Sequence, residues 1–152
     1  MTATNPVGAS VQPVVSKILV ATDFSLPSEF ALEWGRRLGD VLGAKLVLLH
    51  VVDIFGRAEV GCRMVGGDPL LPILRKEAVD GMQQWQTRVP GIEGVVREGS
   101  PRPLIVESAV ELHCQMIVMG THGRSGLAHL LLGSVAEYVV RHSKVPVLTV
   151  RA

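Results

Sequence analysis

The sequence predicts an α/β fold: a single-domain, open, doubly wound parallel sheet of five strands with helices on both faces. Three observations predict it. Short aliphatic runs alternate with helix-like segments along the chain, and strands that alternate with helices form parallel sheets through right-handed crossovers. The runs show little polar alternation, which is typical of strands covered on both faces. The length of 152 residues suits one domain. The expected topology is Rossmann-like.

The first part of the chain predicts a tail, a strand and a helix. Residues 1–15 are rich in Thr, Pro, Gly and Ser and are expected to form a flexible tail, with residues 16–152 as the domain. The run 17–22 is the first strand. Ser25 is a plausible N-cap for the next helix, with Pro27 in its first turn and Gly43 as its C-cap. The apolar stripe expected to face the sheet consists of Phe30, Trp34, Leu38 and Val41.

The middle of the chain predicts two more strands and a helix. The run 45–51 is the second strand, and 53–69 is a long irregular piece, which is usually functional or disordered. A helix is expected over 70–88, and residues 94–98 form a short third strand.

The last third completes the alternation. Ser100 and Pro101 start a helix that ends before the apolar run 116–119. A loop over 120–132 then leads into a helix over 133–143. The inner face of the first of these helices is expected to be Ile105, Ala109 and Leu112. Ser134 and Glu137 have the spacing of a capping box, and Pro146 opens the final strand, 146–150, which indicates a sheet edge.

Composition argues against several classes of function. The formal net charge is +1 with no long basic run, so nucleic acid is a poor partner. No apolar stretch approaches the length of a transmembrane span, and the N-terminus does not resemble a secretory signal. The two cysteines, Cys62 and Cys114, form no disulfide framework or metal cluster, and we expect reduced thiols in a cytoplasmic protein.

The candidate chemistry lies in the loops that follow the strands. In open parallel sheets, ligands bind beyond the carboxyl ends of the strands, where strand order reverses. Asp23 follows the first strand, and Val51 and Asp53 follow the second. The Asp23 carboxylate can accept hydrogen bonds from ribose hydroxyls or help to hold a divalent ion, or it can simply cap the first helix. The Val51 backbone can read an adenine edge.

A glycine-rich loop follows the fourth strand and leads into a helix. It contains Gly120, Gly123 and Gly133, and Ser134 follows. Glycines let a backbone approach a ligand, and the first N–H groups of a helix bind phosphate. Each glycine alone also fits ordinary turn chemistry, and Ser134 fits a plain N-cap. His122 and Arg124 add positive charge. No Walker A lysine, dinucleotide fingerprint or nucleophile elbow is present.

These segments make the chain resemble a universal stress protein from Lys17 to Arg151. ILVATDFS (18–25), LLHVVD (48–53) and the region 117–150 are similar to family segments. The ATP-binding signature of the family is Gly, two residues, Gly, nine residues, Gly, then Ser or Thr. The loop described above fills it without a gap, so the chain resembles the ATP-binding group, within the adenine nucleotide alpha hydrolase-like folds.

The resemblance implies a ligand and an assembly. ATP is the implied ligand, with Mg²⁺ or Mn²⁺ bridging its phosphates. Asp23 would lie near the ribose, the Val51 backbone would hydrogen-bond adenine, and the start of the last helix would hold the phosphates. A homodimer through Val145–Val150 is also implied. The predicted binding residues are Ala21, Thr22, Asp23, Val51, Met119, Gly120, Gly123, Arg124, Gly133, Ser134 and Val135.

Three functions remain open at this point. The first is a nucleotide-binding regulatory module of a stress response. The second is a slow ATPase or transferase, which lacks a positioned general base and a P-loop lysine. The third is a partner-binding scaffold whose site is empty or holds AMP or cyclic AMP, since a helix N-terminus accepts any phosphate.

Overall fold

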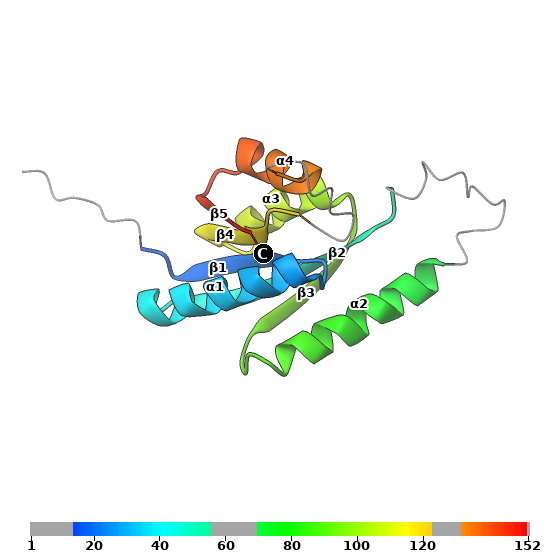
Figure 1. The fold of residues 1–152 in the computed structure, drawn as a ribbon, viewed down its shortest axis with the longest axis horizontal. Helices are drawn as coiled ribbons and strands as arrows, with labels where there is room; N and C mark the ends of the chain where they lie inside the picture. The colour runs from blue at the N-terminus through cyan, green and yellow to red at the C-terminus, as the bar shows by residue number, and fades with distance from the viewer. Residues whose placement is uncertain (1–13, 56–69, 123–131, 152) are drawn as a thin grey trace, which may run out of the picture.

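The computed structural model describes residues 14–55, 70–122 and 132–151, and it has the expected fold (Figure 1). Five parallel strands form one sheet in the order β3-β2-β1-β4-β5. The elements are β1 (Lys17–Thr22), α1 (Leu26–Leu42), β2 (Lys45–Asp53), α2 (Leu71–Gln86), β3 (Glu93–Gly99), α3 (Pro101–Glu111), β4 (Met116–Gly120), α4 (Ser134–His142) and β5 (Val147–Val150). Asp53 ends β2 and does not begin the irregular segment, because β2 stays paired with β3 as far as Asp53 and Gly99.

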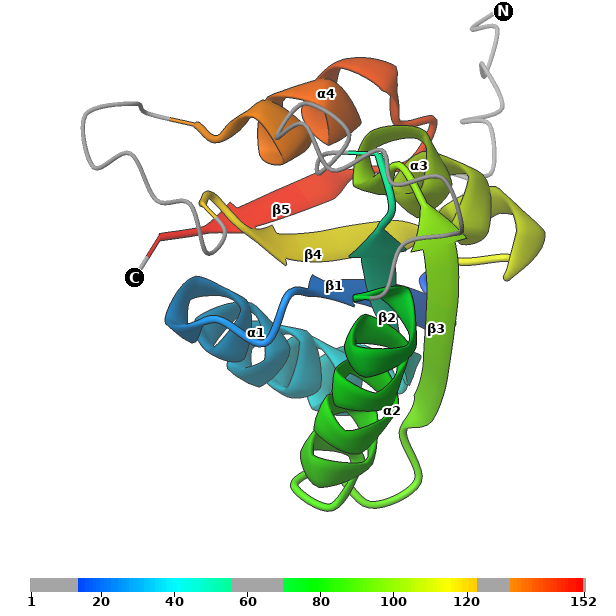
Figure 2. The same cartoon turned by 90° about the vertical axis from the view of Figure 1, so that its right-hand side faces the viewer.

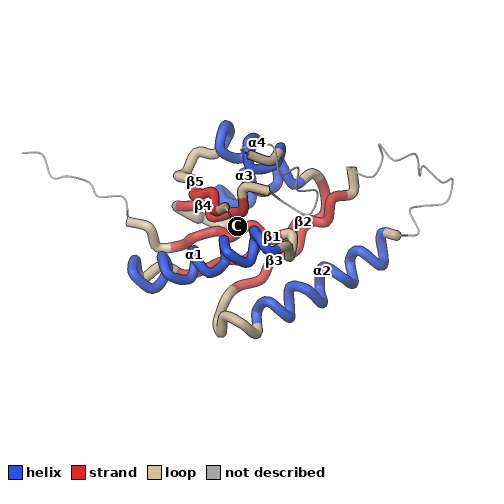
Figure 3. Tube along the Cα trace, in the orientation of Figure 1, coloured by secondary structure: helices blue, strands red, loops and turns tan. Residues whose placement is uncertain are grey.

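The strand order reverses between β1 and β4. The chain passes from β1 outward to β2 and β3, then returns to place β4 on the other side of β1. Ala21 lies opposite Met119 in this central pair. Figure 3 shows the strands as one layer with helices on either side. The carboxyl ends of β1 and β4 therefore form the switch point at which such sheets bind ligands.

Helices cover both faces of the sheet, as Figure 2 shows. α1 and α2 pack on one face, and α3 and α4 pack on the other. Each face has its own aliphatic cluster, and residues of β1 and β4 belong to both. The side of the sheet toward α3 and α4 includes Leu19, Ala21, Leu49, Ile117 and Met119. The opposite side includes Ile18, Val20, Leu48, Val118 and Val150.

The predicted inner face of α1 is wrong. Phe30, Trp34 and Val41 are exposed, and only Leu38 of the expected stripe packs against the core. The buried positions of this helix are Ser28, Ala31, Leu32, Gly35 and Gly39. A Cβ on Gly35 would lie 2.7 Å from Val20 Cγ2, so the helix lies too close to the sheet for larger side chains at its centre. The aromatic residues consequently face outward.

The predicted capping box at the start of α4 is also wrong. Gly133 is the N-cap, and Ser134 is the first helical residue, with no side-chain cap hydrogen bond. The reason lies in the backbone: the Gly133 N–H donates to the Thr121 carbonyl at 2.7 Å, which holds Gly133 extended, and the helix begins directly after it. The Glu137 side chain pairs with Arg141 instead of reaching back.

Other predicted boundaries are confirmed. Gly43 caps α1 in the left-handed conformation, with φ of 66°. Ile105 and Ala109 of α3 are buried, and Leu112 packs against the same core. The strand β5, which follows Pro146, is an edge of the sheet. In the described parts of the chain, no helix is long and apolar enough to cross a membrane.

Candidate functional site

A chain of hydrogen bonds fixes the turn between β1 and α1. The Phe24 N–H donates to the Thr22 hydroxyl, which donates to the Ser28 hydroxyl, which in turn donates to the Ser25 carbonyl. Thr22 and Ser28 are buried. Since the Thr22 hydroxyl is engaged in this chain, the side chain of this predicted binding residue has a structural task. The turn consequently holds Asp23 at a fixed place beyond the end of β1.

Asp23 orders the same turn through its carboxylate. Its Oδ1 accepts hydrogen bonds from the Ser25 N–H, at 3.1 Å, and from the Ser25 hydroxyl. Ser25 is the N-cap of α1, so Asp23 stabilises the approach to the helix without being the cap itself. A carboxylate held in this way stands beside the switch point.

Gly120, at the end of β4, packs directly against the first turn of α1. A Cβ at this position would lie 2.9 Å from Pro27 Cβ, 3.0 Å from the Pro27 carbonyl carbon and 3.1 Å from its oxygen. Real Cβ atoms almost never come as close as the first of these distances, and nine in ten contacts are longer than the other two. The first glycine of the loop therefore brings β4 and α1 together, whatever it does for a ligand.

Thr121 closes the base of the glycine-rich loop. Its carbonyl accepts the Gly133 N–H, and its own N–H donates to the Val150 carbonyl at 2.9 Å. A Cβ on Gly133 would lie 3.0 Å from the Thr121 oxygen. The hydrogen bond between Thr121 and Gly133 thus joins the two ends of the loop, and the second hydrogen bond of Thr121 connects them to the end of β5. Figure 2 shows the ends of β4 and β5 on the same side of the molecule as the starts of α1 and α4.

The first turn of α4 offers backbone donors at this place. Its first helical hydrogen bond runs from the Glu137 N–H to the Gly133 carbonyl, so the N–H groups of Ser134, Val135 and Ala136 precede the helical ladder. Ser134 is exposed. The positive end of the helix dipole adds to these donors. An anion, a phosphate above all, is the ligand that this arrangement suits.

The end of β2 forms the opposite wall. The pairing of β1 with β2 stops at Thr22 and His50, whereas β2 continues with β3 to Asp53. Val51 therefore lies beyond the end of β1. The Thr22 carbonyl lies 2.8 Å from His50 Nδ1, and the His50 ring stacks on Phe24. His50 therefore packs at the end of β2.

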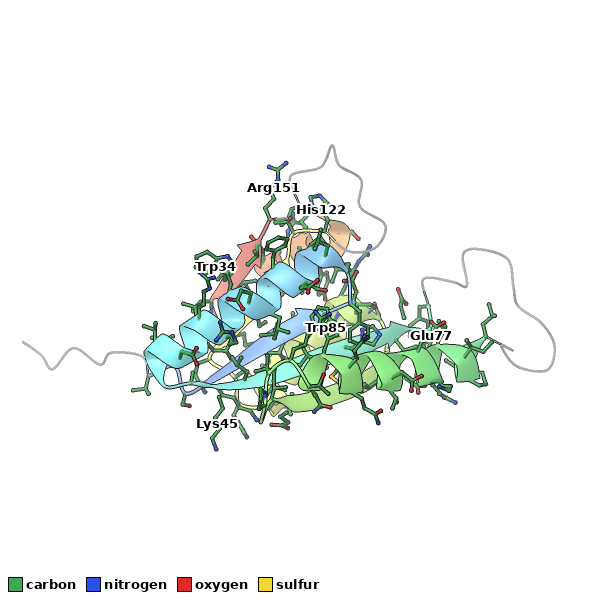
Figure 4. All side chains as sticks on the ribbon, turned by 60° about the horizontal axis from the view of Figure 1, so that its bottom comes forward. Trp34, Lys45, Glu77, Trp85, His122 and Arg151 are labelled. Atoms are coloured by element: carbon green, nitrogen blue, oxygen red, sulfur yellow. The ribbon has the colours of Figure 1, made fainter. Side chains whose placement is uncertain are left out.

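The predicted residues fall into two groups. The structure gathers those of the strand ends and the start of α4 around the switch point, and Figure 4 shows His122 at this end of the sheet, beside the start of α1. Ala21 and Met119 are buried beneath it. Gly123 and Arg124 lie outside the described residues, as do Cys62, His129 and most of the segment 53–69. Among the described side chains, no cluster of His, Cys, Asp or Glu could hold a metal ion by itself.

The sequence did not predict three residues that support the candidate site: Pro27, Ser28 and Thr121. Pro27 was expected only as a helix-start residue, and Ser28 gave no signal, because its role depends on the Thr22 hydroxyl. Thr121 does stand inside the Gly-Thr-His-Gly segment, but its contribution is made by backbone atoms, which every residue type carries.

A separate groove lies between α1 and α2, away from the loop. It has a volume of about 710 Å³, and Figure 4 shows Trp85 and Glu77 on this side. Its lining residues are Phe24, Glu29, Glu77, Asp80, Gly81, Gln84, Trp85 and Arg88. Arg88 is already paired with Glu29 and lies over the Trp85 ring. Its remaining carboxylates make this groove unsuitable for phosphate.

The fold and the loop together define a class: Rossmann-like α/β domains in which the connection from β4 to α4 starts at the β1–β4 switch point. The family is established by comparison with known proteins. The model of the universal stress protein family matches residues 15–151. The chain belongs to that family.

Individual relatives agree with this assignment. Universal stress protein MJ0577 of Methanocaldococcus jannaschii is 30% identical, with 89% of this chain and 94% of the relative aligned. The solved structure of MJ0577 superposes with a TM-score of 0.80, covering 92% of this chain and 98% of the other. A universal stress protein crystallised in complex with cAMP superposes with a TM-score of 0.59 at 27% identity, covering 91% and 98%.

Proposed function

We propose that this protein is an ATP-binding regulatory module of a stress response, which holds the nucleotide at the loop after β4. The observation that carries the proposal is the position of the loop. Gly120 and Gly133–Ser134, the described parts of the signature, meet at the start of α4 beside the switch point. The family's signature spacing and the relative crystallised with cAMP support an adenine nucleotide.

The described residues fit such a ligand. The N–H groups at the start of α4 would donate hydrogen bonds to phosphate oxygens, the Asp23 carboxylate would accept hydrogen bonds from the ribose, and the Val51 backbone would contact adenine. Gly123 and Arg124 would complete the phosphate side. Mg²⁺ or Mn²⁺ would bind to the phosphates and neutralise their charge, with Asp23 acting at most indirectly, because its Oδ1 already accepts two hydrogen bonds.

The test begins with the purified protein. Denaturation should release near-stoichiometric ATP, identified by chromatography and mass spectrometry, and the Gly133→Val variant should release none. Affinity should then be measured by calorimetry for Ser134→Ala, which removes a hydroxyl at the start of α4. We expect a loss of about tenfold, as for one hydrogen bond to a charged group.

A matched control exists at another helix start. Ser100 caps α3 in an extended conformation and likewise makes no side-chain cap hydrogen bond. Ser100→Ala should leave ATP affinity unchanged. Equal affinity in the parent, Ser134→Ala and Gly133→Val proteins would place the nucleotide elsewhere.

The cAMP complex of a relative favours a second candidate: a site that holds AMP or cyclic AMP, in a scaffold that binds a partner. The start of a helix binds any phosphate group, so by itself it does not distinguish ATP from a nucleotide with fewer phosphates. Titrations with ATP, ADP, AMP and cyclic AMP would separate the two, with tighter binding of the monophosphates supporting the second. Phosphate release that scales with protein and is lost in a folded Asp23→Ala variant would instead support a slow ATPase.

The assembly and the location complete the proposal. The free edge of β5 would pair with the β5 of a second copy to form a homodimer through Val145–Val150, as the family resemblance implies. Nucleotide occupancy would alter this dimer or its partner surface. We place the protein in the cytoplasm because its two cysteines form no disulfide framework, and Cys114 is a buried free thiol.

A further inference from the structure

The outer side of α1 carries large apolar side chains that the fold leaves unburied. Phe30 is 45% exposed and Trp34 is 48% exposed, whereas Trp85, the other tryptophan, is 5% exposed. Phe30 and Trp34 are four residues apart, so they lie one above the other on the helix. Aromatic side chains of this size contribute heavily to interfaces.

Two contacts fix the direction in which this aromatic flank faces. Glu29 pairs with Arg88, which follows α2, so one flank of α1 faces α2. Pro27 touches Gly120 of β4 on the other flank. Trp34 follows Pro27 by seven residues, or two helical turns, and shares its flank. Trp34 therefore stands toward β4 and β5, and Figure 4 shows it beside β5.

Trp34 also lies level with the centre of β5. Its neighbour Gly35 lies against Val20. Val20 is in register with Val118, and Val118 is in register with Leu148 of β5. Leu148 is partly buried on this same face of the sheet. A two-fold axis at the free edge of β5 would place Trp34 opposite its own copy.

We propose that the dimer interface has two parts: the paired β5 strands, and the side chains of Phe30 and Trp34. These two side chains would cover the paired β5 strands and contact the same residues on α1 of a second copy. The inference rests on the β5 dimer proposed above. The partner is a second copy because the flank lies level with the edge strand that a copy would extend.

Distances agree with this geometry. α1 packs over β1 and β4, so its axis lies about two strand spacings from a two-fold axis beside β5. The two α1 axes would be about 19 Å apart, whereas directly packed helices lie about 8–10 Å apart. The gap over the strand pair needs large side chains, and an indole from each side supplies them.

Charge does not oppose the contact. The remaining polar residues of the outer helix surface neutralise one another: Glu33 pairs with Arg36 and Arg37, and Arg36 also pairs with Asp40. Two copies of α1 would therefore meet without a net repulsive charge.

The test compares three variants of the full chain with the parent by sedimentation over a concentration series. Trp34→Ala should raise the dimer dissociation constant by about tenfold or more. Val41→Ala is the matched control: Val41 is on the same helix and 83% exposed, but it lies about 10 Å farther along the axis. We expect a change of less than about twofold for Val41→Ala.

Thr149→Pro separates this inference from the dimer itself. The carbonyls of Pro146 and Val150 face β4, so the alternate residue Thr149 presents its N–H to the free edge. Proline removes that donor and is tolerated in an edge strand. Thr149→Pro should yield monomers. A parent protein that stays monomeric at every concentration would overturn both the dimer and this inference.

A dimer lost in Thr149→Pro but unchanged in Trp34→Ala would overturn this inference alone. Fluorescence supplies a second readout, because Trp85 is buried within the monomer. Dilution of the parent should red-shift its emission and increase quenching by acrylamide as Trp34 becomes exposed, and Trp34→Phe should abolish the change. Emission that is independent of concentration while the dimer dissociates would also contradict the proposal.

Discussion

Gly120→Ala should destabilise the protein even when no nucleotide is bound. The added Cβ would meet the Cβ, the carbonyl carbon and the carbonyl oxygen of Pro27 at 2.9, 3.0 and 3.1 Å. Two of these atoms are backbone, and proline fixes their position in the first turn of α1, so no side-chain rotation relieves the contact. Overpacking of this kind costs about 1–3 kcal/mol, and we expect the upper half of that range.

Urea unfolding of nucleotide-free protein measures the effect, since bound ligand would stabilise the folded state. The midpoint should fall while the slope stays constant. The melting temperature should fall by about 2–4 °C for each kcal/mol in a chain of this size. The variant should still fold, because domains commonly have about 5–15 kcal/mol of stability.

Gly133→Ala provides the comparison. Its Cβ would approach one atom, the Thr121 oxygen, at 3.0 Å, and the backbone at φ −71° and ψ 158° suits alanine. Its loss of stability should be less than half that of Gly120→Ala, whereas its loss of nucleotide affinity should be the greater when each is expressed per folded molecule. A Gly120→Ala protein that unfolds at the parent's urea concentration would refute the packing role of this glycine.

Two further predictions concern α1. Gly35→Ala should lower the free energy of unfolding by about 1–3 kcal/mol, because its Cβ would overpack against Val20. In a double-mutant cycle measured by urea unfolding, the variant that also carries Val20→Ala should be more stable, by about 1 kcal/mol or more, than the sum of the two single changes predicts. Strictly additive changes would contradict the close approach of α1 to the sheet. Hydrogen bonds from Arg36 and Arg37 lower the pKa of Glu33 from 4.5 to about 2, so its contribution to stability is complete above pH 4.5 and is lost as the pH falls toward 2. NMR titration should show this low pKa and its rise toward 4.5 in Arg36→Gln and Arg37→Gln, while an unchanged value in both would remove the assigned cause.

The sequence predicted the architecture well because its signals are local. Aliphatic runs, proline at helix starts and glycine after α1 each depend on a few neighbouring residues, and together they predicted every described strand and helix. The inner face of α1 was mispredicted because the size of an apolar residue does not tell which side of a helix it occupies. Gly35 and Gly39 allow α1 to approach the sheet closely. The small residues of the helix therefore face the core, and Trp34 faces outward.

The place of the loop in the fold was predictable from the sequence, but the contacts that support the loop were not. Signature spacing placed the loop between β4 and the next helix, as the element order shows. The closure of its base depends on the backbone of Thr121, and the turn after β1 depends on hydroxyls brought together only in the fold. Such contacts leave no pattern in the residue types, so neither the N-cap at Gly133 nor the role of Ser28 could be derived in advance.

The glycines of the signature are required for different physical reasons. Gly120 is needed because β4 packs against Pro27 of α1 at this position. Gly133 is needed because its backbone lies close to the carbonyl oxygen of Thr121. Thr121 also donates to Val150 at the end of the edge strand. A substitution at either glycine therefore acts on the packing of the loop as well as on any ligand, and lost binding alone cannot identify a contact. Ser134 is exposed at the first position of α4, which makes it the described residue whose substitution reports most directly on the nucleotide.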